Sequence, residues 1–394
     1  MTDSSTSPAV AAIALPRLAH IGSGALERLG SVVETLGVRR PVVVTDRFMV
    51  DTGVAARVVE LLTAAGATPT VFDGTVPDPT TDSLRPGLEV VRAADADAVI
   101  GLGGGSPMDT AKALAVLSRT GGEIADHRAP GAYTGPALPI IAIPTTAGSG
   151  SEATQFTVIT DSATDEKMLC PGLSFLPVAT IVDVDLTMSM PARLSADTGV
   201  DALTHAIEAY VSRKANPFSD GLALAAMRTV AGALRRVWAD GTDRDARAAM
   251  MVAATQAGMA FSNASVALVH GMSRPIGGHF HVAHGLSNAM LLPAVTRFSV
   301  DAAVERYADC ARAMRVVTDA TEDRSAAHAL VDELTRLCAD VEVPTPESHG
   351  IDETRWEERL PVMAEQALAS GSPANNPRVP DAQEIVALYR EIYR

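Results

Sequence analysis

The stretch Ala98-Val-Ile-Gly-Leu-Gly-Gly-Gly-Ser-Pro-Met-Asp109 decides the fold class of this 394-residue chain. Its apolar start predicts a buried strand at 98–101, and a helix follows at 107–118. The glycines between them permit a tight turn and let backbone amides approach an anion at the helix N-terminus. Because the turn lacks GxGxxG spacing, it indicates either a pyrophosphate site or a plain strand-to-helix turn.

Further strand and helix patterns surround this turn. Strands are expected at 41–45, 69–72 and 139–143, and a helix at 52–65. Such alternation predicts a mostly parallel sheet covered by helices on both faces. From residue 194 onward only helical patterns occur, among them 198–211, 221–238, 244–261 and 302–314. We therefore expect an α/β dinucleotide-binding domain over residues 1–192 and an all-helical domain over residues 193–394, as the length also suggests.

Composition and charge narrow the possible partners. The formal net charge is −15 and there is no basic run, which argues against nucleic-acid binding. No apolar stretch reaches the length of a membrane span. The apolar run at 9–15 has no basic region before it, so we expect a disordered tail followed by a first strand, not a signal peptide. The three cysteines lie far apart in sequence, which favours free thiols in a reducing, cytoplasmic setting.

Histidines cluster in the second half of the chain. Asp201 and His205 are four residues apart in a helical pattern, so both can face one ion. His270 and His284 are fourteen residues apart and cannot share an ion on one straight helix. We expect the break at 275–278 to fold the chain back between them. Three imidazoles and one carboxylate would suit Fe²⁺ or Zn²⁺, whereas each histidine alone is more typical of a surface or core position.

Two further segments are candidates for cofactor contacts. Asp46 ends the strand at 41–45, where a carboxylate can accept hydrogen bonds from a ribose and repel a 2′-phosphate, although it can equally be a helix N-cap. The segment Pro144-Thr-Thr-Ala-Gly-Ser-Gly-Ser-Glu152 offers hydroxyls at a strand end, where α/β folds bind ligands, or is a solvent loop.

Several long motifs resemble the iron-containing alcohol dehydrogenase family. They are Gly103-Gly-Gly-Ser-Pro-Met-Asp-Thr-Ala-Lys112, the 144–152 segment, Asp201-Ala-Leu-Thr-His-Ala-Ile-Glu-Ala-Tyr-Val211, His270-Gly-Met-Ser-Arg-Pro-Ile-Gly277 and His284-Gly-Leu-Ser-Asn-Ala-Met-Leu-Leu-Pro293. The resemblance spans nearly the whole chain in the expected order. It implies the fold shared by these enzymes and the dehydroquinate synthase-like proteins, with the active site between the two domains.

The resemblance also implies roles for individual residues. Asp201, His205, His270 and His284 correspond to the metal ligands, with Fe²⁺ as the expected metal and Zn²⁺ as an alternative. Residues corresponding to contacts of NAD, with NADP as an alternative, are Asp46, Gly104, Gly105, Ser106, Asp109, Thr145, Thr146, Ser149 and Lys167. The implied reaction is hydride transfer between a nicotinamide and a small alcohol or aldehyde, in which the metal acts as a Lewis acid.

One position departs from the family pattern. Many members carry a histidine four residues after the third ligand, where this chain has Arg274. An arginine cannot relay protons at neutral pH but can hold a carboxylate, phosphate or phosphonate. Arg274 therefore predicts an anionic aldehyde substrate, or else a structural ion pair. His279 and His281 are alternative proton relays, with His281 favoured, or they line the site without a chemical role.

Two other functions are compatible with this scaffold. A lyase-cyclase of the dehydroquinate synthase type also combines NAD with a metal, but the Asp201 and His205 pair argues against it. A catalytically inactive binding protein is disfavoured by the complete set of four ligands. A homodimer is the default expectation for the assembly.

Overall fold

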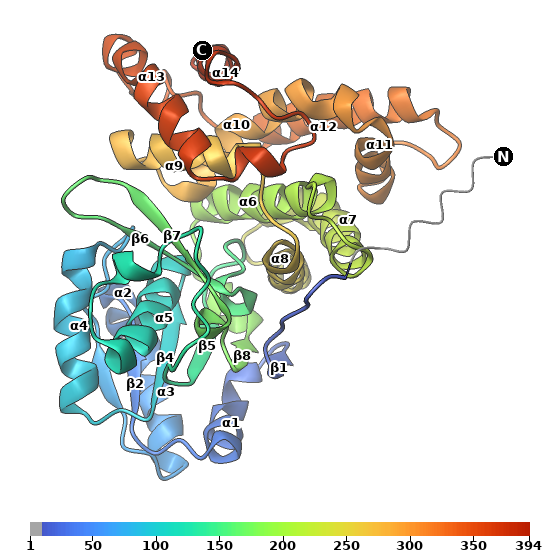
Figure 1. Cartoon of the computed structure of the whole chain (residues 1–394). Coiled ribbons are helices and arrows are strands. Elements are labelled where there is room, and N and C mark those ends of the chain that lie inside the picture. The colour runs from blue at the N-terminus through green and yellow to red at the C-terminus, as the bar shows by residue number, and fades with distance from the viewer. Residues whose placement is uncertain (1–9) are drawn as a thin grey trace.

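The computed structural model describes residues 10–394, so the start of the predicted N-terminal tail lies outside the described part. The first half forms a six-stranded sheet in the order β1-β8-β5-β4-β2-β3 (Figure 1), and every pair in it is parallel. The strands are β1 (Leu18–Ile21), β2 (Pro41–Val44), β3 (Thr70–Phe72), β4 (Ala98–Gly103), β5 (Ile140–Pro144) and β8 (Ala179–Val182). The predicted parallel sheet is therefore confirmed.

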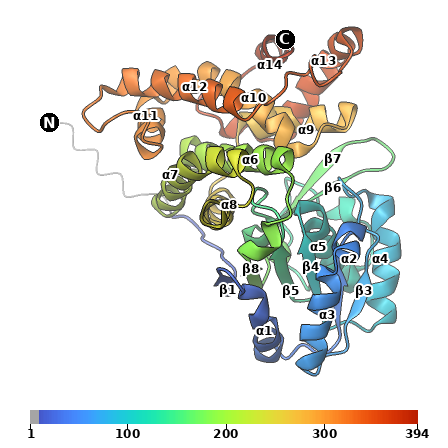
Figure 2. The same ribbon diagram turned by 180° about the vertical axis from the view of Figure 1, so that it is seen from behind.

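Helices cover both faces of this sheet. Because side chains alternate along a strand, Val42 and Val44 pack with α4 (Thr81–Ala93) and α5 (Gly105–Thr120), whereas Val43 packs with α1 (Leu29–Leu36) and α3 (Val54–Ala64). The opposite views in Figures 1 and 2 show these two layers. The central strands β2, β4 and β5 are wholly buried, as expected for a parallel sheet between helices.

Some elements of the first half were not expected from the sequence. The helix predicted at 52–65 is confirmed as α3, whereas the short helix α2 (Arg47–Asp51) before it and α4 were not anticipated. An antiparallel hairpin of β6 (Phe156–Thr160) and β7 (Lys167–Pro171) follows the short 3₁₀ segment η3 (Ser151–Ala153). Figure 1 shows this hairpin extending toward the helical half, so it lies at the junction between the two halves.

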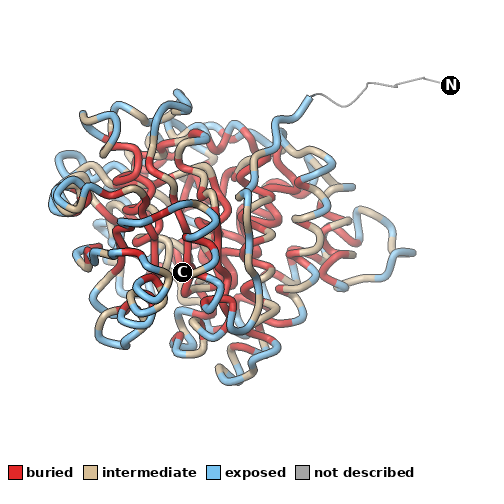
Figure 3. The backbone as a smooth tube through the Cα atoms, turned by 90° about the horizontal axis from the view of Figure 1, so that it is seen from below, coloured by how far each residue is buried: buried red, intermediate tan, exposed pale blue. Residues whose placement is uncertain are grey.

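All regular elements that follow β8 within the described residues are helices. The longer ones are α6 (Ala192–Val211), α7 (Pro217–Ala239), α8 (Arg244–Asn263), α9 (Leu268–Phe280), α10 (His284–Ser299), α11 (Val304–Ala313), α12 (Asp323–Asp340), α13 (Glu353–Ala369) and α14 (Ala382–Ile392). One continuous hydrophobic core joins them, and Figure 3 shows buried segments running through the interior, with exposed turns around them. The predicted fold class is confirmed.

Within residues 10–394, no single helix is long and apolar enough to cross a membrane. The helices α8 and α9, which are bent by 104° relative to each other, have the required length and composition only when taken together.

Candidate metal centre and cofactor site

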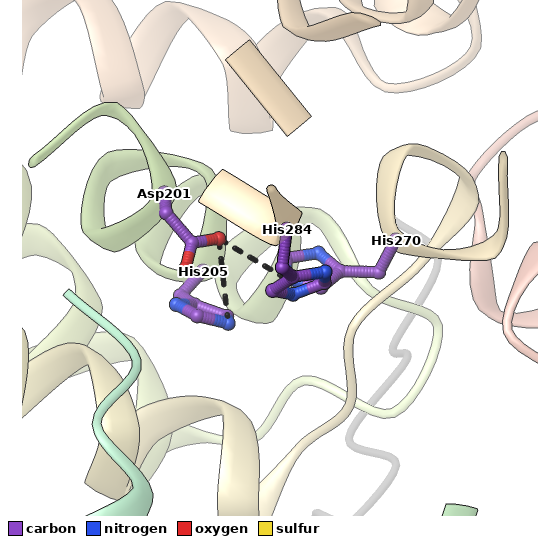
Figure 4. Close-up of side chains that lie close together, drawn as sticks. All are labelled: Asp201, His205, His270 and His284. Carbon is purple, nitrogen blue, oxygen red and sulfur yellow. Dashed lines mark ion pairs between the residues drawn. The ribbon is translucent and has the colours of Figure 1, made fainter. Parts of the chain in front are cut away.

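Four predicted ligands converge where α6, α9 and α10 meet. Asp201 and His205 occupy successive turns of α6, His270 lies near the start of α9, and His284 begins α10. One potential ligand atom from each lies within 4.8 Å of all the others, and Figure 4 shows these side chains turned toward one another. Donors bound to one ion at about 2.1 Å would lie about 3.0–3.4 Å apart, so the cluster is slightly wider than a loaded site.

The chain reversal that brings His270 and His284 together is not where the sequence suggested. We expected a break at 275–278, but α9 continues through Pro275 and both glycines to Phe280. The reversal occurs at 281–283, where His281 adopts a left-handed conformation with φ of 56°. A proline inside a helix does not necessarily end it when tertiary packing holds the flanking turns, and Pro275 and Ile276 are both buried.

Glu208 contacts His270 on the side of the ring away from the other three predicted ligands, and it was not identified from the sequence. Its carboxylate accepts hydrogen bonds from the backbone N–H groups of Ala267 at 2.9 Å and Val269 at 2.6 Å, and it lies 2.6 Å from His270 Nδ1. A proton on Nδ1 leaves Nε2 of His270 free to face a metal. The spacing of Asp201, His205 and Glu208, at positions i, i+4 and i+7 of one helix, is the signal that identifies it.

Burial and charge set the protonation of the four ligands. Burial lowers the pKa of His205 to about 4 and that of His284 to about 3, so both rings are neutral at pH 7. Burial also opposes ionisation of Asp201, yet the surrounding imidazoles bring its pKa below the usual range. Burial likewise opposes a charged His270, but Glu208 and Asp201 raise its pKa. An ionised carboxylate beside the neutral imidazoles of His205 and His284 fits a divalent transition metal.

The glycine-rich turn lies at the carboxyl end of β4. Gly103 has φ of +142°, and a Cβ there would lie 2.6 Å from Pro107 Cγ, so the turn requires glycine. A Cβ on Gly104 would contact Thr146, and one on Gly105 would contact Ser149. The turn and the 144–152 segment therefore form one continuous surface at the start of α5, where backbone amides can receive a pyrophosphate.

Two residues of α5 fasten the 151–158 segment to this turn. Asp109 accepts hydrogen bonds from Ser151 Oγ at 2.8 Å and from the backbone N–H of Val158 at 3.0 Å. Fully buried Lys112 donates to both oxygens of Thr154 and to the carbonyl of Phe156. The Asp109 carboxylate, which was expected to contact the cofactor, is thus occupied by protein donors.

The remaining predicted cofactor residues lie around the same edge of the sheet. Asp46 Oδ1 accepts from the backbone N–H of Met49 and caps α2, which is the alternative that its position had left open. Thr145 is buried, and its backbone N–H donates to Gly103 O at 2.9 Å. Lys167 on β7 forms a 2.8 Å ion pair with Asp78, whose backbone N–H donates to Ser106 Oγ at 3.3 Å. Asp78 therefore connects Lys167 and Ser106, both of which are predicted to contact the cofactor.

Arg274 lies one turn after His270 on α9. Its Nη1 donates to Ser372 Oγ at 3.0 Å, and within residues 10–394 no carboxylate forms an ion pair with it. Burial lowers the pKa of Arg274 to about 10, which leaves the guanidinium charged at neutral pH. Glu208 attracts it from a distance but already accepts the three hydrogen bonds described above. The structural ion pair considered as an alternative is therefore not formed.

The two additional histidines have different surroundings. His279 Nε2 lies 2.9 Å from Gln366 Oε1 on α13, and nine residues at 100° each place it on the opposite face of α9 from His270. His281 is exposed and directly follows α9, in a left-handed conformation. Neither belongs to the cluster of four ligands.

The two halves of the chain touch closely beside the site. Gly150, at φ of +62°, packs backbone to backbone against Gly258 of α8, where added Cβ atoms would meet the other glycine at 2.6 Å. Phe261 of the same helix stacks on His205 with ring centroids 4.3 Å apart. This contact fixes the 144–152 segment relative to the predicted metal ligands.

Comparisons with known proteins agree with this arrangement. The model described as "Iron-containing alcohol dehydrogenase" matches residues 16–184, and "Fe-containing alcohol dehydrogenase family, C-terminal" matches residues 195–393. The chain belongs to the iron-containing alcohol dehydrogenase family.

Individual relatives of this family cover almost the entire chain. Lactaldehyde reductase of Escherichia coli K12 is 39% identical over 378 residues, which are 95% of this chain and 97% of that protein. The 1,3-propanediol dehydrogenase of Citrobacter freundii is 36% identical over 96% of this chain and 98% of its own. The sulfoacetaldehyde reductase of Bifidobacterium kashiwanohense, solved in complex with NAD⁺, is 28% identical, with a TM-score of 0.86 over 98% of this chain and 99% of its own.

Family membership and site agree on the class of reaction. This iron-containing alcohol dehydrogenase is an oxidoreductase that acts on alcohol and aldehyde pairs and uses NAD(H) and Fe²⁺. Neither a lyase-cyclase of the dehydroquinate synthase type nor an inactive binding protein is favoured.

Proposed function

We propose that the chain interconverts a small anionic aldehyde, bearing a carboxylate, phosphonate or similar group, and the corresponding alcohol. The observation that carries this proposal is the Arg274 guanidinium, which is half-buried, charged and bonded to a neutral hydroxyl. A charge that is partly withdrawn from water without an ionic partner is costly, and an anionic substrate group would compensate it. The similarity to a sulfoacetaldehyde reductase supports this choice, because the substrate of that enzyme is an anionic aldehyde.

The chain's own residues divide the remaining tasks. We propose that Asp201, His205, His270 and His284 hold Fe²⁺, while Glu208 orients His270. When bound, the metal supplies Lewis acidity that polarises the carbonyl group. Arg274, one turn from His270, would orient the substrate through its anionic end and so place its carbonyl group near the centre.

The cofactor would lie along the carboxyl ends of β4 and β5. Gly104, Gly105 and Ser106 are proposed to receive the pyrophosphate, with Thr145, Thr146, Ser149 and Lys167 nearer the nicotinamide. When bound, NAD(H) supplies or accepts the hydride. Asp46 is proposed to accept hydrogen bonds from the adenosine ribose, which favours NAD over NADP. Asp109, whose carboxylate is occupied, would act by holding Ser151 and Val158.

The substrate proposal is tested with matched aldehydes. Succinic semialdehyde and butanal have the same chain length and differ in charge. Arg274→Ala should raise KM for succinic semialdehyde by about 10- to 100-fold, because one to two charge-assisted hydrogen bonds are lost. KM for butanal should change little, and Arg274→Lys should recover part of the loss. Equal losses for both aldehydes, or a wild-type enzyme that does not prefer the anion, would contradict the proposal.

We propose that His281, and not His279, relays the proton, because His281 is exposed and follows the last turn of α9, whereas His279 Nε2 lies 2.9 Å from Gln366 Oε1. His281→Gln should lower kcat with little change in KM. His279→Gln is the matched control, since that ring contacts Gln366. Equal effects of the two substitutions on kcat would contradict this assignment.

A homodimer is proposed as the assembly. β1 is an edge strand of the main sheet, its Ile21 is exposed, and the preceding residues Val10, Ile13 and Leu15 expose further apolar surface. An unpaired apolar edge favours association with a second chain. Light scattering on the purified protein tests this, and a monomer would contradict it.

We also propose a cytoplasmic location, in keeping with three free buried cysteines. The two domains are proposed to divide between residues 192 and 193.

A further inference from the structure

The carboxamide of Asn288 faces three of the four proposed metal ligands. Asn288 is fully buried on α10, one turn after His284. Its Nδ2 lies 2.7 Å from Asp201 Oδ1, 3.1 Å from His270 Nε2 and 3.2 Å from His284 Nε2. One neutral side chain therefore contacts ligand atoms from all three helices that build the centre.

The orientation of this amide is imposed by the ligand atoms. Nδ2 carries two N–H donors. The Asp201 carboxylate and the neutral His284 ring offer lone pairs toward it, and so does Nε2 of His270 when the proton of that ring is on Nδ1, beside Glu208. Oδ1 of Asn288 itself is buried without a hydrogen-bond partner, which is unfavourable because a buried acceptor loses its hydrogen bonds to water. The reversed amide would place Oδ1 against Asp201 Oδ1, where two acceptors repel. The proposed ligands therefore hold Nδ2 toward the centre, although this orientation leaves Oδ1 without a hydrogen bond.

We propose that Asn288 is a positioning residue of the metal centre. Without an ion, its N–H groups share the lone pairs of Asp201, His270 and His284 and so keep the buried ligands converged. With an ion bound, the two imidazole lone pairs turn to the metal, while one N–H continues to hold the Asp201 carboxylate. Such outer contacts reduce the reorganisation that metal binding requires. The inference rests on the proposed metal centre.

A role in packing alone predicts a different outcome, because it would change stability without changing metal affinity. Asn376 provides the matched control: it is buried in the same helical half, and its Nδ2 donates to Ser299 Oγ at 2.8 Å and Arg378 O at 2.7 Å. None of these partners is a proposed metal ligand. Asn376→Leu therefore removes a comparable buried amide and leaves the centre intact.

The experiment uses full-length protein from which metal has been stripped, and it measures the affinity for Co²⁺ by competition with a chelator. The visible spectrum of the bound Co²⁺ is recorded as a second readout. Melting temperatures of each variant are measured with and without metal. Asn288→Leu should raise the dissociation constant by about 10- to 100-fold and alter the spectrum. Asn376→Leu should lower the melting temperature and leave both metal readouts unchanged. If Asn288→Leu does not fold, Asn288→Ser, which shortens the side chain and admits water, should show the same direction of change.

Two results would overturn the proposal, and they are distinguishable. Wild-type affinity and spectrum in the folded Asn288 variant would show that Asn288 only packs. Absence of Co²⁺ binding in the wild-type chain would instead refute the metal centre itself, and the role of Asn288 with it.

Discussion

The contact between Gly150 and Gly258 gives a quantitative test of how the two halves of the molecule are joined. The perturbation is Gly258→Ala in α8. A Cβ there would lie 2.6 Å from Gly150 O and 2.8 Å from Gly150 Cα. Gly232, in the interior of α7, is the matched control, because a Cβ there has no other atom within 4 Å.

The magnitude follows from two opposing effects. Glycine to alanine in a helix interior gains about 1 kcal/mol, which Gly232→Ala should show in full. At Gly258 the backbones must separate before the methyl group fits, and such overpacking costs about 1–3 kcal/mol. The helix-propensity gain is common to both positions, so we expect the two variants to differ by the overpacking cost, about 1–3 kcal/mol in the free energy of unfolding, with Gly258→Ala the less stable.

The separation should also be visible in cofactor binding. Moving Gly150 displaces the adjoining segment that carries Thr146 and Ser149, which contact the glycine-rich turn. KM for NADH should therefore rise about tenfold in Gly258→Ala, since displacements approaching 1 Å commonly cost one to two orders of magnitude, and remain unchanged in Gly232→Ala. Urea denaturation and steady-state kinetics supply the measurements. Two variants of equal stability and equal KM would refute the tight junction.

Three further predictions concern individual residues. Burial lowers the pKa of Lys112 to about 8, so from pH 8 to 10.5 the folded chain loses a proton that the unfolded chain keeps. The free energy of unfolding of wild type relative to Lys112→Met should therefore rise by about 3 kcal/mol across that pH range. Urea titrations measure this difference, and a difference that stays constant with pH would contradict the prediction. Glu208→Gln should weaken metal binding by about 10- to 100-fold, because the amide N–H group would face one of the three groups that donate hydrogen bonds to Glu208. Metal analysis after dialysis against a chelator measures this. Full retention of metal would exclude a role of Glu208 in metal binding. Asp46→Ala should lower stability by about 1 kcal/mol through loss of the α2 N-cap. It should also raise the ratio of kcat/KM for NADPH to kcat/KM for NADH. An unchanged ratio would show that Asp46 does not determine the choice of cofactor.

Features with a local cause were predictable from the sequence. The strand, glycine turn and helix around Gly104 form as expected because apolar runs and glycines act within a few residues. The pairing of Asp201 with His205 also depends only on helical spacing. The position of the reversal after His270 was wrong, because whether Pro275 ends a helix is decided by the packing of distant segments around it.

Features that depend on tertiary contacts were missed. Glu208 and Asn288 carry no signal as single residues, yet each lies at helical spacing from a ligand, and that spacing would have identified them once the ligands were known. The occupied carboxylate of Asp109 depends on the 151–158 segment returning to α5, which no local pattern encodes. The absence of an ion pair at Arg274 is likewise visible only in three dimensions.

The hydrogen bond between Arg274 and Ser372 has a consequence for the divergence of this enzyme family. Ser372 belongs to the segment before η7 (Pro373–Asn375), which is remote in sequence from every proposed metal ligand and from the glycine-rich turn. Substrate choice can therefore change through Ser372 and its segment, which positions Arg274 but holds no proposed metal ligand. The same separation offers protein engineers a small set of positions at which libraries can seek new aldehydes without sacrificing metal or cofactor retention.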